Sequence, residues 1–317
     1  MPCKVIFLVF LGNAMMNRSI YVLFLALGLT SCAQLNTATK LGSSIAAQAG
    51  LITSTQAASL QRVSETVEKT SQDITPSQEY YLGRSVSATL LSKYPVSSRH
   101  IQANRYLNLI GKTLVLSSDK PETYGNYHFA VLDSDQINAF AAPSGFIFVT
   151  KGMIRLCKNE DDLAAVLAHE ISHVLHSHAL KSIKTSHITS ALTIIGSEAV
   201  KTYAGNVVPA ELLQAFEGSI DDVTQTLVNS GYGRGLESEA DKTAVTLLQN
   251  AGYNSESLLR VLNQLKANTK PNSADFSATH PDTDDRISDV TGWLQTGAVN
   301  PVSAVRTTRF YSVFKQL

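Results

Sequence analysis

The feature that most constrains this chain is residues 163–180, LAAVLAHEISHVLHSHAL. Its apolar residues recur at helical spacing, which predicts a helix from about residue 160 to residue 178. This helix carries half of the eight histidines of the chain, namely His169, His173, His176 and His178. A metal site, a pH-sensitive patch and a polar helix face are the possible interpretations, and the spacing of the histidines has to decide between them.

The first two of these histidines belong to an H-E-x-x-H motif, His169-Glu170-Ile171-Ser172-His173. A spacing of four residues places both imidazoles on one helix face, within reach of a single Zn²⁺. Glu170 lies near the same face, where it can contact a water molecule at the metal without being a ligand. Because the motif also occurs by chance, the prediction of a metal site needs a third ligand.

The segment GRGLESEAD offers that ligand on a second predicted helix, residues 236–252. Glu237 and Asp241 stand four residues apart on one face, whereas Glu239 points elsewhere. Glu237 can therefore be the third ligand, and Asp241 can accept a hydrogen bond from the free N–H of a ligating histidine. A merely solvated acidic face is the alternative, and the H-E-x-x-H motif favours the metal site.

The other two histidines of the segment are predicted to lie outside the site. A ligand pair of His173 and His176 would leave Glu170 without a role, and His178 is rotated away from His173. Both are expected at the exposed end of the helix, where cationic imidazoles suit the dipole.

The motifs together resemble a known family. H-E-x-x-H followed by R-x-x-E-x-E-A-D is similar to the HtpX/CAAX-prenyl-protease type of zinc metallopeptidase, a branch of the gluzincins. NAFAAPSGFIFVTKGMI and THPDTDDRI resemble two further blocks of that family, in the same order. The similarity covers about residues 75–292. The chain departs from the family pattern at Ala142, Ser144 and Gly233, and none of these is a presumed ligand.

The resemblance implies one zinc ion per chain, peptide hydrolysis as the reaction and Glu170 as the general base. It also implies the zinc ligands His169, His173 and Glu237. The tetrahedral oxyanion needs a partner besides zinc, and His280 and Arg286 are the candidates. In related periplasmic members the histidine of the H-P stretch also caps the zinc and holds the enzyme latent. For His280, that site role competes with a simple loop-capping role.

The block that resembles N-A-F-A-L-P-G-G indicates where a substrate binds. Residues 146–149 are a candidate edge strand that pairs with the substrate backbone. An ordinary core strand is the alternative, and the alternation of side chains does not decide between them. The residues expected to contact substrate are Asn138, Gly145, Phe146, Ile147 and Phe148.

The remaining patterns predict one α+β domain over residues 74–317. It is expected to be mostly helical and zincin-like, with a small sheet beside the active-site helix. Thr75, Pro76 and Gln78 form the capped start of its first helix. Two strands are predicted, at residues 127–134 and 145–152, with a loop between them. The remaining predicted elements are helices at residues 98–116, 188–199, 212–227 and 254–267, a short helix that holds Trp293, and a possible strand at residues 305–314.

The N-terminal stretch MNRSIYVLFLALGLTSC predicts a signal peptide over residues 1–31, with Met15 or Met16 as the true start. Its apolar run is too short for a spanning helix with normal flanks. The final L-T-S-C resembles the lipobox of bacterial lipoproteins, which implies lipidation of Cys32; an incidental cysteine is the alternative. Residues 32–73 are then a lipidated N-terminus and tether. The resemblance implies a Gram-negative outer-membrane lipoprotein that faces the periplasm.

Composition narrows the function further. Lys and Arg number 26, as do Asp and Glu, so the formal net charge is zero and nucleic acid is not an expected partner. After processing only Cys157 remains free, and it is expected to be a buried apolar residue rather than a nucleophile.

The leading hypothesis is a lipid-anchored zinc endopeptidase that cleaves misfolded or misassembled envelope proteins. Its partners would be protein or peptide substrates, the membrane through the lipid anchor, and the envelope assembly machinery. The alternatives are an assembly chaperone with an occluded, latent zinc site, and a lipoprotein that sequesters metal with all four histidines.

Overall fold

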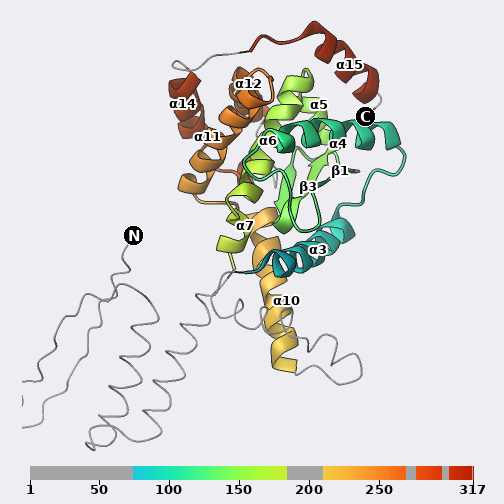
Figure 1. Ribbon diagram of the computed structural model, residues 1–317, viewed down its shortest axis with the longest axis vertical. Coiled ribbons are helices and arrows are strands. Elements are labelled where there is room, and N and C mark those ends of the chain that lie inside the picture. Colours follow the sequence, from blue (N-terminus) through green and yellow to red (C-terminus); the bar gives the residue numbers. More distant parts are fainter. Residues whose placement is uncertain (1–73, 184–209, 269–275, 295–299, 316) are drawn as a thin grey trace, which may run out of the picture. The chain divides into compact units, whose positions relative to one another are not determined.

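A computed structural model of the chain describes residues 74–183, 210–268, 276–294, 300–315 and 317 (Figure 1). The predicted signal peptide, Cys32, the tether and the helix at residues 188–199 lie outside this part of the chain. The described residues form an α+β, mostly helical structure, as predicted. All of them fall within the expected domain of residues 74–317, and its boundaries stay a prediction.

The helices follow in chain order. They are α3 (Pro76–Lys93), α4 (Ile101–Leu116), α5 (Lys151–Leu156), α6 (Glu160–Leu175), α7 (His178–Lys181), α10 (Ala210–Gln225), α11 (Arg234–Asn250), α12 (Glu256–Asn268), α13 (Phe276–Thr279), α14 (Thr283–Leu294) and α15 (Ala304–Phe314), with a 3-10 turn η1 (Pro143–Gly145) and a π-helical turn η3 (Thr226–Ser230). Among the described residues, no helix has both the length and the apolar character to cross a membrane.

One small sheet lies beside these helices. It has the strand order β1-β3-β2, made of β1 (His128–Leu132), β2 (Ala139–Ala142) and β3 (Phe146–Thr150). β3 runs parallel to β1 and antiparallel to β2, with Phe129 opposite Ile147 and Phe140 opposite Phe148. The prediction that residues 146–149 form an edge strand is therefore wrong, since their backbone is paired on both sides.

β2 is a strand that the sequence did not predict. Its residues AFAA fall in a stretch expected to be a loop, and all four are buried. Both faces of the sheet are covered: Ala141 and Ile147 pack in the apolar cluster around α4 and α6, whereas Phe140 and Phe148 pack in the cluster with α3 and η3. A strand buried on both faces has no alternation of polar and apolar residues, so the usual signal of a strand is missing.

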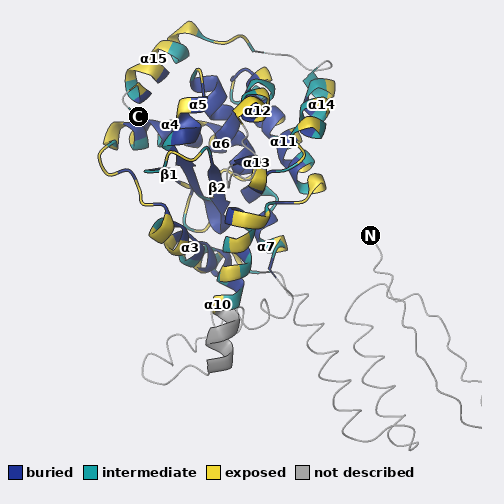
Figure 2. Cartoon of the chain, turned by 180° about the vertical axis from the view of Figure 1, so that it is seen from behind, coloured by how far each residue is buried: buried dark blue, intermediate teal, exposed yellow. Residues whose placement is uncertain are grey.

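Helix α6 runs through the interior (Figure 2). Every residue from Glu160 to Val174 is buried, so the helix is enclosed on all sides rather than amphipathic. The small residues Ala164, Ala165 and Ala168 allow close approach, and all three belong to the larger apolar cluster. The most extensive packing of α6 is against α11, and of the three strands it packs most against β2.

The first turn of α6 buries three carboxylates. Asn159 caps the helix by accepting a hydrogen bond from the main-chain N–H of Asp162. Each acidic side chain is paired with an arginine from a later helix, at N–O distances of 2.7 to 3.1 Å: Glu160 with Arg309, Asp161 with Arg306, and Asp162 with Arg260. Negative charge is favourable at a helix N-terminus, and the arginines complete its neutralisation.

The other end of α6 comes earlier than predicted. The helix ends at Leu175, and Ser177 adopts a left-handed conformation with φ of 52° before the short α7 begins at His178. The expected single helix to residue 178 is therefore broken by a turn. That turn redirects the chain, so His178 points back toward α6 instead of continuing its helical face.

Other sequence predictions have mixed outcomes. The capping box of Thr75 and Gln78 is present, and Cys157 is buried. The tail is a helix, α15, and the predicted strand there is wrong. Ser303 caps this helix, and Phe310 and Phe314, one turn apart, are both buried, which a helix achieves and a strand with period two does not.

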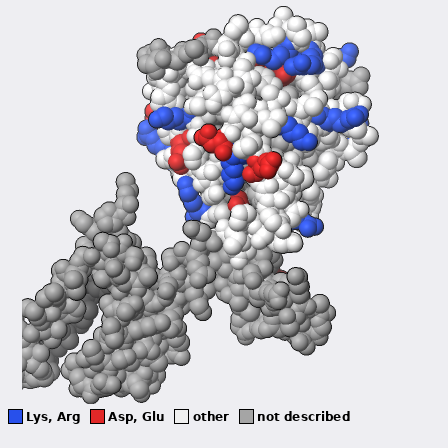
Figure 3. All heavy atoms as spheres, viewed as in Figure 1, with Lys and Arg blue, Asp and Glu red and all other residues white. Residues whose placement is uncertain are grey.

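On the face seen in Figure 3, charged residues of both signs intermingle among uncharged ones.

Candidate active site

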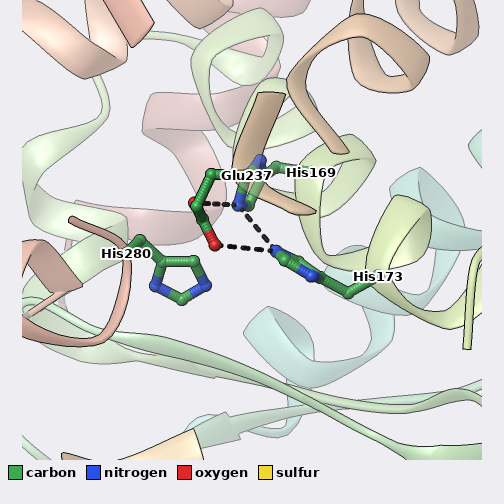
Figure 4. A group of neighbouring side chains, drawn as sticks. All are labelled: His169, His173, Glu237 and His280. Carbon is green, nitrogen blue, oxygen red and sulfur yellow. Dashed lines mark hydrogen bonds and ion pairs between the residues drawn. The ribbon is translucent and has the colours of Figure 1, made fainter. Parts of the chain in front are cut away.

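Four potential metal ligands converge in the interior (Figure 4). His169 and His173 come from α6, Glu237 from the first turn of α11, and His280 directly follows α13. One donor atom of each lies within 4.8 Å of the others, and all four side chains are buried. The packing of α11 against α6 thus brings together residues that are far apart in the sequence.

The shortest distances join the residues expected to share a metal. Nε2 of His169 lies 3.0 Å from Nε2 of His173. The carboxylate of Glu237 lies 3.5 Å from each of these nitrogen atoms, through Oε2 and Oε1 respectively. The three side chains therefore face a common point, on the side of α6 that the four-residue spacing had selected.

Polar atoms at this point lack partners. Oε1 of Glu237, Oε1 of Glu170 and Nε2 of His280 are buried and make no hydrogen bond with the described residues. Such atoms are rare in native proteins because they lose the hydrogen bonds that water would make. A cation at the centre would satisfy the atoms of Glu237 and His280, and a water molecule beside it would satisfy Glu170. Imidazole and carboxylate are donors that Zn²⁺ takes in catalytic sites. The residues therefore fit a zinc ion.

Asp241 lies where the sequence placed it, with Oδ1 2.9 Å from Nδ1 of His169. Arg286 donates to both oxygens of this carboxylate, over 2.7 and 2.8 Å. Burial opposes ionisation of Asp241, but Arg286 and His169 outweigh it and hold the pKa of Asp241 well below its usual value. The carboxylate is thus kept charged and able to hold the His169 ring.

Arg286 contacts presumed ligands and their partner Asp241. Besides Asp241, its Nη1 lies 3.0 Å from Oε2 of Glu237 and donates to the main-chain oxygen of His280 over 3.3 Å. With these donors engaged, the buried guanidinium faces Asp241, Glu237 and the main chain of His280, and its expected role as a partner of the oxyanion stays a prediction.

Glu170 and His280 lie next to each other at the donor group. Oε1 of Glu170 is 3.8 Å from Nε2 of His280. Burial raises the pKa of Glu170 to about 7, which suits a residue that takes up and releases a proton near neutral pH. Burial also lowers the pKa of His280 to about 3, so its ring is neutral, as a metal ligand must be. The ring stacks on Phe276 at a centroid distance of 3.9 Å.

His178 is the main residue that sequence reasoning missed. It was expected at an exposed helix end, and its side chain is fully buried. Its Nδ1 lies 2.8 Å from Nδ1 of His173, and its Nε2 lies 3.0 Å from Glu239. His176 is partly exposed and bonds Thr243 instead. No local signal indicates this arrangement, since it depends on the turn at Ser177.

Tyr232 is a second unpredicted neighbour of the site. Its ring stacks on His173 at 4.3 Å and 19°. It directly follows Gly231, whose φ of 69° and close approach to the main chain of Thr279 exclude a side chain there. The expected substrate residues lie in and beside the sheet: Asn138 and Ile147 are almost completely buried, and Gly145 has a φ of 92°.

Residues 101–294 match the model of Peptidase family M48, and the chain belongs to that family. This confirms the resemblance inferred from the motif blocks. The chain is 30% identical over 189 residues to the beta-barrel assembly-enhancing protease of Yersinia pestis. It is 27% identical over 194 residues to the protein of the same name from Escherichia coli (strain K12). It is 25% identical over 195 residues to the mitochondrial metalloendopeptidase OMA1 of Schizosaccharomyces pombe.

These matches cover only parts of the proteins compared. They span 58% of this chain for each of the two bacterial relatives and 60% for the yeast relative. They span 37% of the length of each bacterial relative and 52% of the yeast relative. The region that matches the family model, residues 101–294, includes all four residues of the donor group.

Proposed function

We propose that this chain is a zinc-dependent endopeptidase. The observation that carries the proposal is the convergence of His169, His173 and Glu237 on one buried point, with Glu170 beside them. Two helices that present potential zinc ligands, with an unpartnered glutamate beside them, suit metal-assisted hydrolysis of an amide bond. Membership of Peptidase family M48 supports the same reaction.

The chain's own residues have distinct tasks in this reaction. When zinc is bound, it supplies a Lewis acid that polarises the scissile carbonyl and acidifies a water molecule. Glu170 accepts the proton of that water and delivers it to the leaving amine. Asp241 orients the ring of His169, and Arg286 keeps Asp241 and Glu237 charged.

The substrate strand would lie along β2. This strand is an edge of the sheet in the described part of the chain, and it packs against the active-site helix. Asn138 and Gly145 lie before and after it in the sequence. On its other side, β2 pairs with Phe146, Ile147 and Phe148 of β3. An extended peptide can add to such an edge by main-chain hydrogen bonds. Turn η3 contacts β2, so this proposal requires η3 to move for substrate to enter.

A latent state of the same enzyme is the second candidate. His280 adds a fourth buried donor to the three expected ligands. Catalytic zinc sites keep one position open, whereas four protein donors are typical of closed sites. His280 would therefore hold the site closed until it is displaced, which also agrees with a chaperone that has an occluded zinc site.

The cellular setting is part of the proposal. The lipobox-like sequence before Cys32 supports a lipid anchor, and the names of the Yersinia and Escherichia relatives support a place in envelope assembly. The substrates would be misfolded or misassembled envelope proteins, met from the periplasmic side of the outer membrane. Replacement of Cys32 by Ser should release the protein from membrane fractions; unchanged fractionation would remove the anchor.

The reaction is tested with purified residues 33–317, an unfolded protein as substrate and the variant Glu170→Gln. Zinc content should stay at one ion per chain, and cleavage should fall about 100- to 10,000-fold, the range expected for loss of a general base. Glu256→Gln, at an exposed position on α12, is the matched control. Equal cleavage by the Glu170 variant and the wild type would refute the mechanism.

Latency has its own variant. If wild type binds zinc without cleaving, His280→Ala should release activity that Glu170→Gln then abolishes in the double variant. Inactivity of His280→Ala with zinc still bound would favour the non-enzymatic chaperone.

A further inference from the structure

The two imidazoles of the H-E-x-x-H motif are held in different ways. Nδ1 of His169 meets a carboxylate directly, that of Asp241. Nδ1 of His173 meets another imidazole, with Nδ1 of His178 at 2.8 Å. Nε2 of His178 in turn lies 3.0 Å from Oε2 of Glu239. His173 is thus connected to a carboxylate through one intervening ring.

The partners determine which nitrogen atoms carry hydrogen. An ionised carboxylate only accepts hydrogen bonds, so Nε2 of His178 is the donor to Glu239. A neutral His178 then has its lone pair on Nδ1, which accepts the N–H of Nδ1 of His173. His173 is left with the lone pair of Nε2, the atom that faces Glu237 and His169.

The surroundings hold this chain of rings in place. His178 is fully buried, and the left-handed Ser177 is the turn that brings it under His173. Tyr232 stacks on the ring of His173. We call the connection from His173 through His178 to Glu239 the relay. Glu239 stands two residues after Glu237 on α11, so one helix turn supplies both a presumed ligand and the last residue of the relay.

We propose that His178 and Glu239 are positioning residues that fix the tautomer and orientation of His173 for metal binding. The proposal rests on the proposed function only in that the donor group binds zinc. It gives Glu239, a side chain with 44% exposure that lies outside the donor group, control over zinc affinity. Partners of this kind typically contribute about 10- to 100-fold to metal affinity.

The test is the zinc dissociation constant of the mature chain, measured by competition with a chromophoric chelator. Glu239→Ala and His178→Phe should each weaken zinc binding about 10- to 100-fold. Glu239→Gln should weaken it less, because the amide oxygen still accepts from His178. His178→Gln should keep most of the zinc affinity that His178→Phe loses, since its amide oxygen accepts from His173 and its amide nitrogen donates to Glu239.

His176→Gln is the matched control. Its imidazole lies 3.5 Å from Glu239 and stacks on the ring of His178 at a centroid distance of 5.5 Å, but its hydrogen bond is to Thr243 and not to His173 or His178, so zinc affinity should be unchanged. A loss as large as that of Glu239→Ala would mean that local charge, not the relay, sets the affinity, and would overturn the proposal. Circular dichroism checks folding, and the half-exposed Glu239 keeps the test valid if His178→Phe does not fold.

A second readout separates positioning from general stability. The ring ¹⁵N shifts of His173 in the zinc-free protein should show the proton on Nδ1, and Glu239→Ala should mix the two tautomers. Wild-type protein that binds no zinc would refute the proposed function itself. Zinc bound with equal affinity by wild type, Glu239→Ala and His178→Phe would refute the relay alone.

Discussion

The two ends of helix α6 both bury charged or polar groups, and they differ in how those groups are satisfied. At the first turn, Glu160, Asp161 and Asp162 each have an arginine partner. Near the last turn, Glu170 has a carboxylate oxygen without any hydrogen bond, as has Glu237, which faces the same point. Matched charges at one end indicate a structural role, and unmatched donors at the other end indicate a missing partner.

The difference also concerns where the partners come from. The arginines at the first turn belong to α12 and α15, so that end ties the C-terminal helices to the core. At the other end the partners contact the presumed zinc ligands, and none of them takes the place of a metal ion. These partners are Asp241, His178 and Arg286. One end of α6 is closed by protein alone, whereas the other presents a buried group of potential metal ligands.

Removal of one arginine at the first turn should have the largest effect on stability. Arg306→Ala leaves Asp161 fully buried without the two hydrogen bonds, of 2.7 and 3.1 Å, that it now accepts from this side chain. Breaking a buried pair in this way should lower the free energy of unfolding by about 3 to 5 kcal/mol, measured by denaturant titration.

The matched control is an exposed pair of the same chemistry. Arg234 and Asp285 are similarly close, 2.8 Å apart, but their side chains are 60% and 49% exposed. Arg234→Ala should therefore change stability by less than about 1 kcal/mol. Similar losses in the two variants would remove the structural role of the first turn.

Chelation of zinc should have a somewhat smaller effect. At free zinc of 100 times the dissociation constant, binding adds about 2.7 kcal/mol to the stability of the folded state. A chelator should thus lower the melting temperature by about 5 to 10 °C for a domain of this size.

The same chelation applied to Arg306→Ala tests whether the ends of α6 are independent. They are about 20 Å apart along the helix, a distance at which effects usually add. Zinc should therefore shift the melting temperature of the variant as much as that of wild type. A shift that disappears in Arg306→Ala would show that the two ends are coupled.

Neutralisation of a presumed ligand should have the smallest effect on stability and a large effect on binding. Glu237→Gln removes a buried charge, and Arg286 keeps its two bonds to Asp241. The stability of the zinc-free protein should change by less than about 1 kcal/mol, because Arg286 stays paired with Asp241 and no buried charge is left without a partner. Zinc affinity should fall more than about 100-fold, beyond what loss of an outer partner causes.

This outcome is the reverse of that at the first turn, where removal of a partner lowers the free energy of unfolding. Calorimetry of the zinc-free variant and chelator competition measure the two quantities separately. A loss of several kcal/mol in zinc-free Glu237→Gln would contradict the division of α6 into a structural end and a ligand-binding end.

Local patterns were enough to predict which residues of the donor group share a helix face. The four-residue spacing of His169 and His173 sets their common face on any helix, and the same spacing relates Glu237 to Asp241. The capping box at Thr75 is likewise a matter of adjacent residues. Each of these predictions depends on backbone geometry within one or two helical turns, which the order of residues already contains.

Other features depended on contacts between distant segments. The strand β2 exists because α6 lies on one face of the sheet and α3 and η3 lie on the other. The central place of β3 follows from a parallel pairing with β1 that local alternation does not reveal. α15 is a helix because Phe310 and Phe314 find a buried site beside α4 and α6.

By itself, the sequence determined which residues share a helix face: the two imidazoles of His169 and His173 on one helix, with Glu170 near them, and the carboxylates of Glu237 and Asp241 on another. Tertiary structure alone decided that His178 lies between His173 and Glu239, that Arg286 contacts Asp241 and Glu237, and that His280 joins the donor group. The side chains of His178, Arg286 and His280 come from α7, α14 and the segment after α13, and they meet the ligands only once these segments pack around α6. The physical reason is that helical spacing acts over a few residues, whereas partners of a buried group are set by packing.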